Sequence, residues 1–130
     1  MNSLYLDASA LTKLVVVEDE TAAVRAFVRG RSLVSSRVAV VEVTKAVARH
    51  DPSADPGPML SQLTLIDLDP ELARAAAATG GYQLRALDAI HVASAMRVAA
   101  DLEAFVTYDP RQAAAAKAAG LRVLGPGPIG

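Results

Sequence analysis

Short apolar segments alternate with amphipathic segments along the whole chain, and this alternation constrains the fold more than any other feature. Apolar runs typical of buried strands occupy residues 4–6, 31–34, 63–68, 104–107 and 121–124. Between them, apolar side chains recur at helical spacing in residues 9–16, 21–29, 38–49, 69–79, 87–99 and 112–119. Strands that alternate with helices form parallel sheets with right-handed crossovers. The sequence therefore predicts an α/β fold with three α/β/α layers around a central parallel sheet.

The length of the chain sets the number of domains. With 130 residues there is material for one hydrophobic core, so we expect a single domain over residues 1–130. Pro and Gly gather in residues 51–58, and we interpret this segment as a loop because too little sequence lies on either side of it for two cores. Within the domain, Ser9 is expected to cap the first helix, Ser35 or Ser36 the third, and Met96 is expected to face the core.

Charge and composition exclude several classes of protein. The formal net charge is -1, so a nucleic-acid partner would have to bind a local positive patch. The chain has no cysteine, which excludes disulfides and thiolate zinc sites and suits a cytoplasmic protein. The longest apolar runs are too short to span a bilayer, and no secretory signal pattern is present at the N-terminus, so we expect no membrane association.

Four acidic residues are expected to meet at one edge of the sheet. Asp7 and Asp109 each follow a predicted strand and precede a helix, which places both at the carboxyl edge, where ligands bind in open α/β sheets. Asp88 lies in the first turn of its helix, and Glu42 lies one to two turns inside another. A side chain can reach the same edge from either position.

Carboxylates gathered at one site repel each other. Two unit charges about 4 Å apart cost about 4 kcal/mol at an effective dielectric constant near 20, so such a group must bind protons or cations. Mg²⁺ or Mn²⁺ suits a site made only of oxygen ligands, and its coordination is commonly completed by phosphate oxygens of a substrate. Such an ion can lower the pKa of a bound water and stabilise the leaving oxygen during phosphodiester hydrolysis.

Each of these acids also has a purely structural interpretation. Asp109, which is followed by Pro110, is a good helix N-cap, and Asp88 is stabilised by the dipole of its helix. Glu42 taken alone is typical of a solvated surface acid. Asp7 is the hardest to explain in this way, because the end of a buried strand is a costly place for an unpaired charge.

The segments around the four acids resemble the PIN-domain nucleases. They are Leu6-Asp7-Ala8-Ser9-Ala10-Leu11, Val41-Glu42-Val43, Leu87-Asp88-Ala89-Ile90-His91-Val92-Ala93 and Thr107-Tyr108-Asp109-Pro110-Arg111. The resemblance covers nearly the whole chain, and the spacing and length are most similar to the VapC branch, the toxins of type II toxin-antitoxin pairs.

The resemblance implies a function and a set of site residues. Asp7, Glu42, Asp88 and Asp109 correspond to an acidic quartet that binds Mg²⁺ or Mn²⁺ and cuts RNA. Ser9 and Thr107 match small hydroxyl residues that lie near the metal. The resemblance also implies a homodimer that is held inactive by a cognate antitoxin protein.

Several other polar residues have two interpretations. Arg85 and Arg111 lie close in sequence to two of the acids, so they either hold RNA phosphates by bidentate contacts or pair with surface acids. His91 follows Asp88 by three residues, so it either contacts a phosphate or a ligand water, or it is packed and hydrogen-bonded within the protein. Three glutamates are rejected as the fourth acid because none lies on a helix that would point back to the carboxyl edge: Glu18, Glu20 and Glu71.

Two other functions remain open at this point. A phosphoacceptor receiver domain also gathers acids at the carboxyl edge of a parallel sheet, but it has adjacent acids after the first strand and a Lys after the last one. Here Asp7 stands alone, and Lys117 lies within a predicted helix. The other alternative is a PIN-like nucleic-acid-binding module without activity, in which a metal would have only a structural role.

Overall fold

The computed structural model describes residues 2–125, and its elements follow the predicted alternation of strands and helices. The strands are β1 (Ser3–Leu6), β2 (Ser32–Ser36), β3 (Thr64–Ile66), β4 (Leu102–Val106) and β5 (Val123–Leu124). The helices are α1 (Ala8–Lys13), α2 (Thr21–Val28), α3 (Val38–His50), α4 (Gly57–Leu60), α5 (Pro70–Ala77), α6 (Ala86–Arg97), the 3-10 turn η1 (Ala99–Asp101) and α7 (Pro110–Ala118). In this part of the chain, no helix is long and apolar enough to cross a membrane.

The five strands form one parallel sheet in the order β3-β2-β1-β4-β5. Strand β1 is central, and its Tyr5 pairs with Val34 of β2 and with Phe105 of β4. The sheet grows from β1 to β3 in one direction and from β4 to β5 in the other, so the strand order reverses between β1 and β4. Open α/β sheets bind ligands outside the carboxyl ends of the strands at such a reversal. Receiver domains have the order 2-1-3-4-5, so the observed order excludes that alternative.

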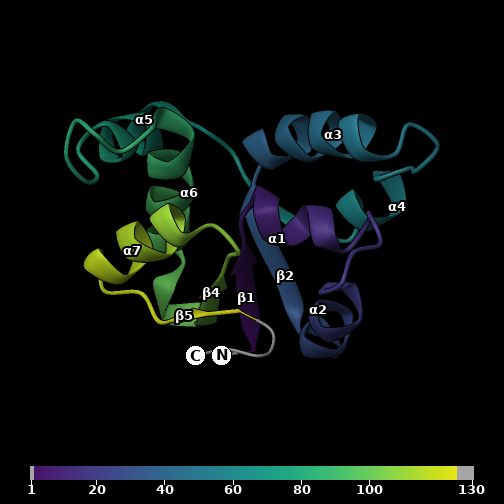
Figure 1. Ribbon diagram of the computed structural model, residues 1–130. Helices are drawn as coiled ribbons and strands as arrows, with labels where there is room; N and C mark the ends of the chain where they lie inside the picture. The colour runs from purple at the N-terminus through teal and green to yellow at the C-terminus, as the bar shows by residue number, and fades with distance from the viewer. Residues whose placement is uncertain (1, 126–130) are drawn as a thin grey trace.

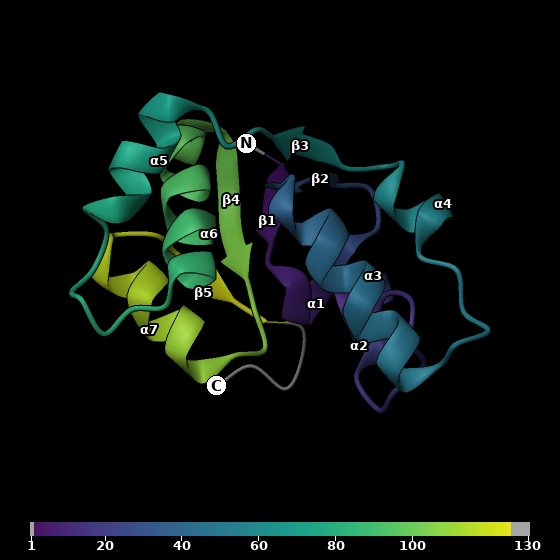
Figure 2. The ribbon, with the colours of Figure 1, turned by 90° about the horizontal axis from the view of Figure 1, so that it is seen from above.

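Helices cover both faces of the sheet, which confirms the three-layer α/β/α prediction (Figure 1). On one face, Leu4 and Leu6 of β1 pack with α1 to α4. On the other face, Tyr5 stacks on Phe105 with ring centroids 5.1 Å apart, next to α5, α6 and α7. Seen from above in Figure 2, the two helical layers lie on opposite sides of β1 and β4. Successive side chains of β1 therefore supply two separate cores, as expected for a strand buried on both faces.

Three local predictions were wrong in detail. Helix α1 begins at Ala8 and is capped by Asp7 rather than Ser9, because β1 ends at Leu6 and leaves only one residue for the turn. The N-cap of α3 is Arg37, which makes no side-chain cap bond, rather than Ser35 or Ser36. The Ser35 hydroxyl donates to Leu6 O within the sheet, and Ser36, one residue before the cap, accepts from Val38 N at 3.2 Å. Met96 is 43% exposed, because it lies on the face of α6 turned away from the sheet.

Candidate active site

Asp7 is the residue directly after β1, and its side chain is almost fully buried, with 4% exposure. Its Oδ1 accepts hydrogen bonds from Ser9 Oγ at 2.6 Å and from Ala10 N at 3.1 Å. Its Oδ2 accepts from Thr107 Oγ1 at 2.5 Å. Burial raises the pKa of Asp7, and these hydrogen bonds oppose the shift. The chain thus holds a buried carboxylate in one fixed orientation at the reversal of the strand order.

Ser9 and Thr107 connect the end of β1 to the end of β4. Besides donating to Asp7, the Thr107 hydroxyl accepts from Asp109 N at 3.0 Å. The Ser9 hydroxyl accepts from Tyr108 N at 2.9 Å and lies 3.2 Å from Thr107 Oγ1. Both hydroxyls touch the buried carboxylate, so they fix the position of its oxygens relative to the loop that carries Asp109.

Asp109 is joined to this network through Thr107, and its charge acts on Asp88. Asp109 Oδ1 accepts from Arg111 N at 2.9 Å, so Asp109 is an N-cap of α7, as its structural interpretation predicted. Asp88 lies in the first turn of α6. Partial burial raises the pKa of Asp88, and the negative charge of Asp109 raises it further. The two carboxylates are therefore close enough to repel each other, and we call Asp7, Asp88 and Asp109 the acidic edge.

Glu42, on α3, contacts a histidine of α6, the helix that also carries Asp88. Its Oε1 lies 2.7 Å from His91 Nε2, and His91 Nδ1 lies 2.7 Å from the hydroxyl of Tyr5. His91 is on α6, one turn after Asp88, and is 1% exposed. The interpretation of His91 as a packed, hydrogen-bonded residue is thus confirmed. Of the glutamates rejected as the fourth acid, Glu18 and Glu20 pair with Lys13 instead.

The four acids do not form a ready-made metal cage. In the part of the chain that the structure describes, no three Asp, Glu or His side chains converge closely enough to hold one ion. The donor set nevertheless fits a hard divalent cation, since every candidate ligand is a carboxylate oxygen. Asp7 accepts three hydrogen bonds, which leaves about one of its roughly four lone-pair directions for a cation. The raised pKa values of Asp7 and Asp88 have the sign expected for carboxylates that a bound cation would stabilise.

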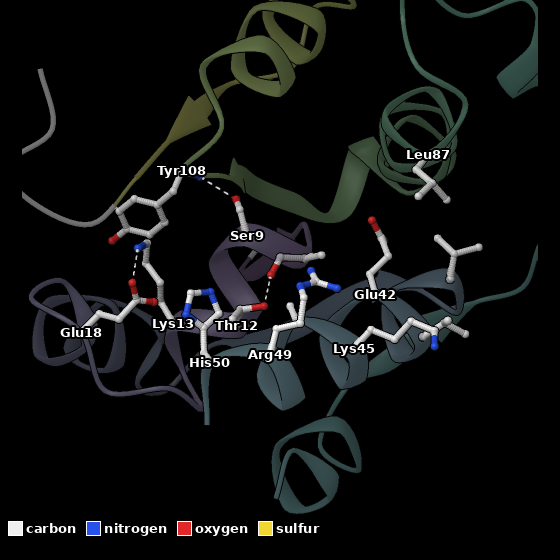
Figure 3. Close-up of a pocket in the computed structure, with 14 residues that line it drawn as sticks. Ser9, Thr12, Lys13, Glu18, Glu42, Lys45, Arg49, His50, Leu87 and Tyr108 are labelled. Atoms are coloured by element: carbon white, nitrogen blue, oxygen red, sulfur yellow. Dashed lines mark hydrogen bonds and ion pairs between the residues drawn. The ribbon is translucent and has the colours of Figure 1, made fainter. Parts of the chain in front are cut away.

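A groove of about 810 Å³ opens beside Ser9 and Glu42, between α1, α3 and the start of α6. Figure 3 shows Ser9 and Tyr108 on one side of it and the α3 side chains Lys45 and Arg49 on the other. Lys45 and Arg49 are exposed, and within residues 2–125 neither forms an ion pair with an acid. We call this pocket the basic groove. The sequence analysis missed both cations, although their helical spacing from Glu42 places all three on one side of α3.

Arg85 and Arg111 lie on the other side of the acidic edge. Together with Asp88 they line a second pocket of about 410 Å³, between the loop before α6 and the helix α7. Their positive charges oppose the rise in the pKa of Asp88 that burial and Asp109 cause. The structure thus brings both predicted arginines to the acidic edge, which has cationic side chains on either side.

Comparison with known proteins defines the family to which this chain belongs. The PIN domain family model matches residues 4–118, and the chain belongs to the PIN domain family. Among curated proteins, Ribonuclease VapC46 of Mycobacterium tuberculosis is 40% identical, over 97% of this chain and 99% of that protein. Ribonuclease VapC47 of the same species is 34% identical, over 97% and 98% of the two chains. Ribonuclease VapC35 is 36% identical, over 95% and 97%. The resemblance to the VapC branch of the PIN domain family is therefore confirmed.

Proposed function

We propose that this protein is a metal-dependent endoribonuclease that acts as the growth-inhibiting toxin of a toxin-antitoxin pair. The observation that carries the proposal is the buried carboxylate of Asp7, fixed by Ser9 and Thr107 at the reversal of the strand order. Thr107 connects Asp7 to Asp109, whose charge acts on Asp88. Relatives that align over nearly the whole chain are named ribonucleases.

Asp7, Asp88 and Asp109 would hold Mg²⁺ or Mn²⁺, with Glu42 as the fourth acid of the site. When bound, such an ion supplies activation of a water and stabilisation of the leaving oxygen in phosphodiester hydrolysis. The protein fixes the orientation of the carboxylates that would hold the ion. Ser9 and Thr107 donate to separate oxygens of Asp7 and so prevent the carboxylate from turning. Because Asp88 and Asp109 repel each other, they favour a cation or a proton at the position between them.

The RNA strand would cross the acidic edge between two pairs of cations. Lys45 and Arg49 in the basic groove would bind phosphates on one side of the scissile bond, and Arg85 and Arg111 would bind them on the other. The chain has a formal net charge of -1, so local pairs of cations, rather than a global field, would attract the polyanion. This arrangement favours a substrate strand that is bound on both sides of the cut.

The biological setting follows from the VapC resemblance. We propose a cytoplasmic protein that forms a homodimer and is inhibited by a cognate antitoxin protein. Expression of the chain alone should arrest bacterial growth, and an Asp7→Asn or Asp88→Asn variant should relieve the arrest. Growth arrest that persists with both variants, at equal expression, would contradict the toxin proposal.

Cleavage of labelled RNA by the purified protein tests the enzymatic proposal. We expect cleavage with Mg²⁺ or Mn²⁺, none with EDTA, and loss of cleavage in Asp7→Asn and in Asp88→Asn. Asp101→Asn, which removes an exposed carboxylate from η1, is the matched control and should cut RNA normally. A wild-type protein that binds RNA and Mn²⁺ but leaves RNA intact would favour the alternative of a PIN-like binding module without activity.

A further inference from the structure

A chain of three buried or partly buried groups crosses the interior beneath the acidic edge. Tyr5 on β1 is fully buried and is stacked on Phe105. Its hydroxyl lies 2.7 Å from His91 Nδ1, and the other ring nitrogen, Nε2, lies 2.7 Å from Glu42 Oε1. Glu42 belongs to α3 and His91 to α6, which cover opposite faces of the sheet. Within residues 2–125, His91 is therefore the hydrogen-bond partner that ties the Glu42 side chain to the α6 side of the molecule.

The hydrogen-bond geometry is compatible with one arrangement of protons in which every group of this chain has a partner. A phenol hydroxyl carries its proton at neutral pH, so the Tyr5 hydroxyl can donate to Nδ1 at 2.7 Å. A neutral imidazole that accepts at Nδ1 carries its own proton on Nε2. In that tautomer Nε2–H donates to Glu42 Oε1 at 2.7 Å.

His91 also lies next to the other acids. Its charge, when present, acts on the pKa of both Asp7 and Asp88, in each case against a larger rise that burial causes. One imidazole is thus close to Asp7 and Asp88 and in direct contact with Glu42.

Without the bond to His91, the Glu42 carboxylate could pair with cationic side chains of its own helix. Lys45 and Arg49 lie on the same side of α3, three and seven residues further on, and both line the basic groove with Glu42. A glutamate with free rotamers pairs readily with a lysine three or four residues away on a helix. The bond from His91 keeps the carboxylate on the side of the acidic edge rather than among these cations.

We propose that His91 is a positioning residue that holds Glu42 at the acidic edge through the Nε2–H bond, and that Tyr5 fixes the orientation of its ring. The proposal rests on the proposed function, because it assumes that Glu42 is the fourth acid of the site. Partners that orient the ligands of a metal typically change metal affinity by about 10–100-fold when they are removed. His91 would have this effect without touching the metal or the RNA itself.

Mn²⁺ titration calorimetry on the purified full chain tests the proposal without any cleavage step. We expect His91→Phe and Glu42→Gln each to weaken Mn²⁺ binding about 10-fold or more. The double variant should be no weaker than the single variants, because His91 acts only through Glu42. His91→Gln retains an amide that can donate to Glu42, so it should restore part of the affinity. Tyr5→Phe leaves the imidazole without its outer partner and should cause a smaller loss.

Two controls separate positioning from stability. Val92 is the fully buried neighbour of His91 on α6, and Val92→Ala should lower the melting temperature without changing Mn²⁺ affinity. In the metal-free wild-type protein, nuclear magnetic resonance of the imidazole nitrogens should find the proton of neutral His91 on Nε2. A neutral His91 with its proton on Nδ1 could not donate to Glu42 and would overturn the proposal.

The remaining outcomes each decide the question. Folded His91→Phe with wild-type Mn²⁺ affinity would overturn the proposal, and tighter Mn²⁺ binding would overturn it as well, because His91 would then withhold Glu42 from the site. If His91→Phe does not fold, equal Mn²⁺ affinities of His91→Gln, Tyr5→Phe and wild type would have the same consequence. If Glu42→Gln itself binds Mn²⁺ normally, there is nothing for His91 to position. The proposed function would still stand if Asp7→Asn abolished RNA cleavage.

Discussion

Replacing Thr107 by Val removes one hydroxyl and keeps the shape of the side chain. The hydroxyl donates to the buried Asp7 carboxylate at 2.5 Å and accepts from Asp109 N at 3.0 Å. A hydrogen bond to a charged group contributes about 1.5–3 kcal/mol, and a buried donor left without a partner costs about 1–3 kcal/mol. Because Asp109 N is only partly buried and water can replace its partner, we expect a net loss of about 2–4 kcal/mol. For 130 residues this corresponds to a fall in melting temperature of about 7–15 °C.

The loss should depend on pH in a direction that the structure fixes. Removing a hydrogen bond that favours the ionised carboxylate raises the already raised pKa of Asp7 in the folded variant. At a pH low enough for Asp7 to be protonated in both the folded wild type and the folded variant, the destabilisation that comes from losing the bond to the ionised carboxylate is absent. It appears as the pH rises through the folded-state pKa of Asp7 and is complete above the higher value in the variant.

Thermal unfolding in EDTA, followed by calorimetry at acidic and neutral pH, measures this effect. The matched control is Thr21→Val, because the hydroxyl of Thr21 is also buried and also both donates and accepts, but its acceptor is the neutral carbonyl of Val16. We expect Thr21→Val to lower the free energy of unfolding by about 1–2 kcal/mol, with little dependence on pH. If Thr107→Val costs no more than Thr21→Val at neutral pH, Asp7 is not held by a charge-assisted bond and the reasoning is wrong.

Three further predictions concern the metal, the pH and the RNA. At a free Mn²⁺ concentration of 100 times its dissociation constant, the wild-type protein should gain about 2.7 kcal/mol, or about 10 °C in melting temperature, and Asp7→Asn should lose this gain. The free energy of unfolding of the metal-free protein should fall as the pH rises above 3.8 through the raised folded-state pKa values of Asp7 and Asp88. In Asp88→Asn the free energy of unfolding should fall less steeply with pH. Lys45→Glu combined with Arg49→Glu should weaken RNA binding and should reduce the slope of the logarithm of the binding constant against the logarithm of the salt concentration by about 1.4. The control variant, Lys117→Glu combined with Arg122→Glu, should change neither.

The positions of Asp7 and Asp109 could be predicted from the sequence because they depend on local pattern alone. A carboxylate between a buried strand and a helix must lie at the carboxyl edge of a parallel sheet. The pairing of β1 with β4 then brings the two acids into one region, and this pairing follows from the strand order rather than from either segment. The resemblance to the PIN domain family supplied that long-range information before the structure did.

Other parts of the site depend on distances that no local pattern encodes. The bond between His91 and Glu42 joins residues 49 positions apart on helices from opposite layers, so the sequence left both interpretations of His91 open. The basic groove likewise exists only because α1 and α6 lie beside α3. The sequence alone therefore did not identify Lys45 and Arg49 as residues that line it. The predicted cap at Ser9 was wrong for a related reason, since the Ser9 hydroxyl is used in contacts with Asp7 and Tyr108 across β1 and β4.

The most direct test of the central claim is a crystal structure of the protein grown with Mn²⁺ and measured near the manganese absorption edge. The account predicts an anomalous peak at the carboxyl ends of β1 and β4, coordinated by oxygens of Asp7 and of at least one of Asp88 and Asp109. An anomalous peak elsewhere, or none at an Mn²⁺ concentration that supports RNA cleavage, would contradict the claim that these carboxylates together hold the cation.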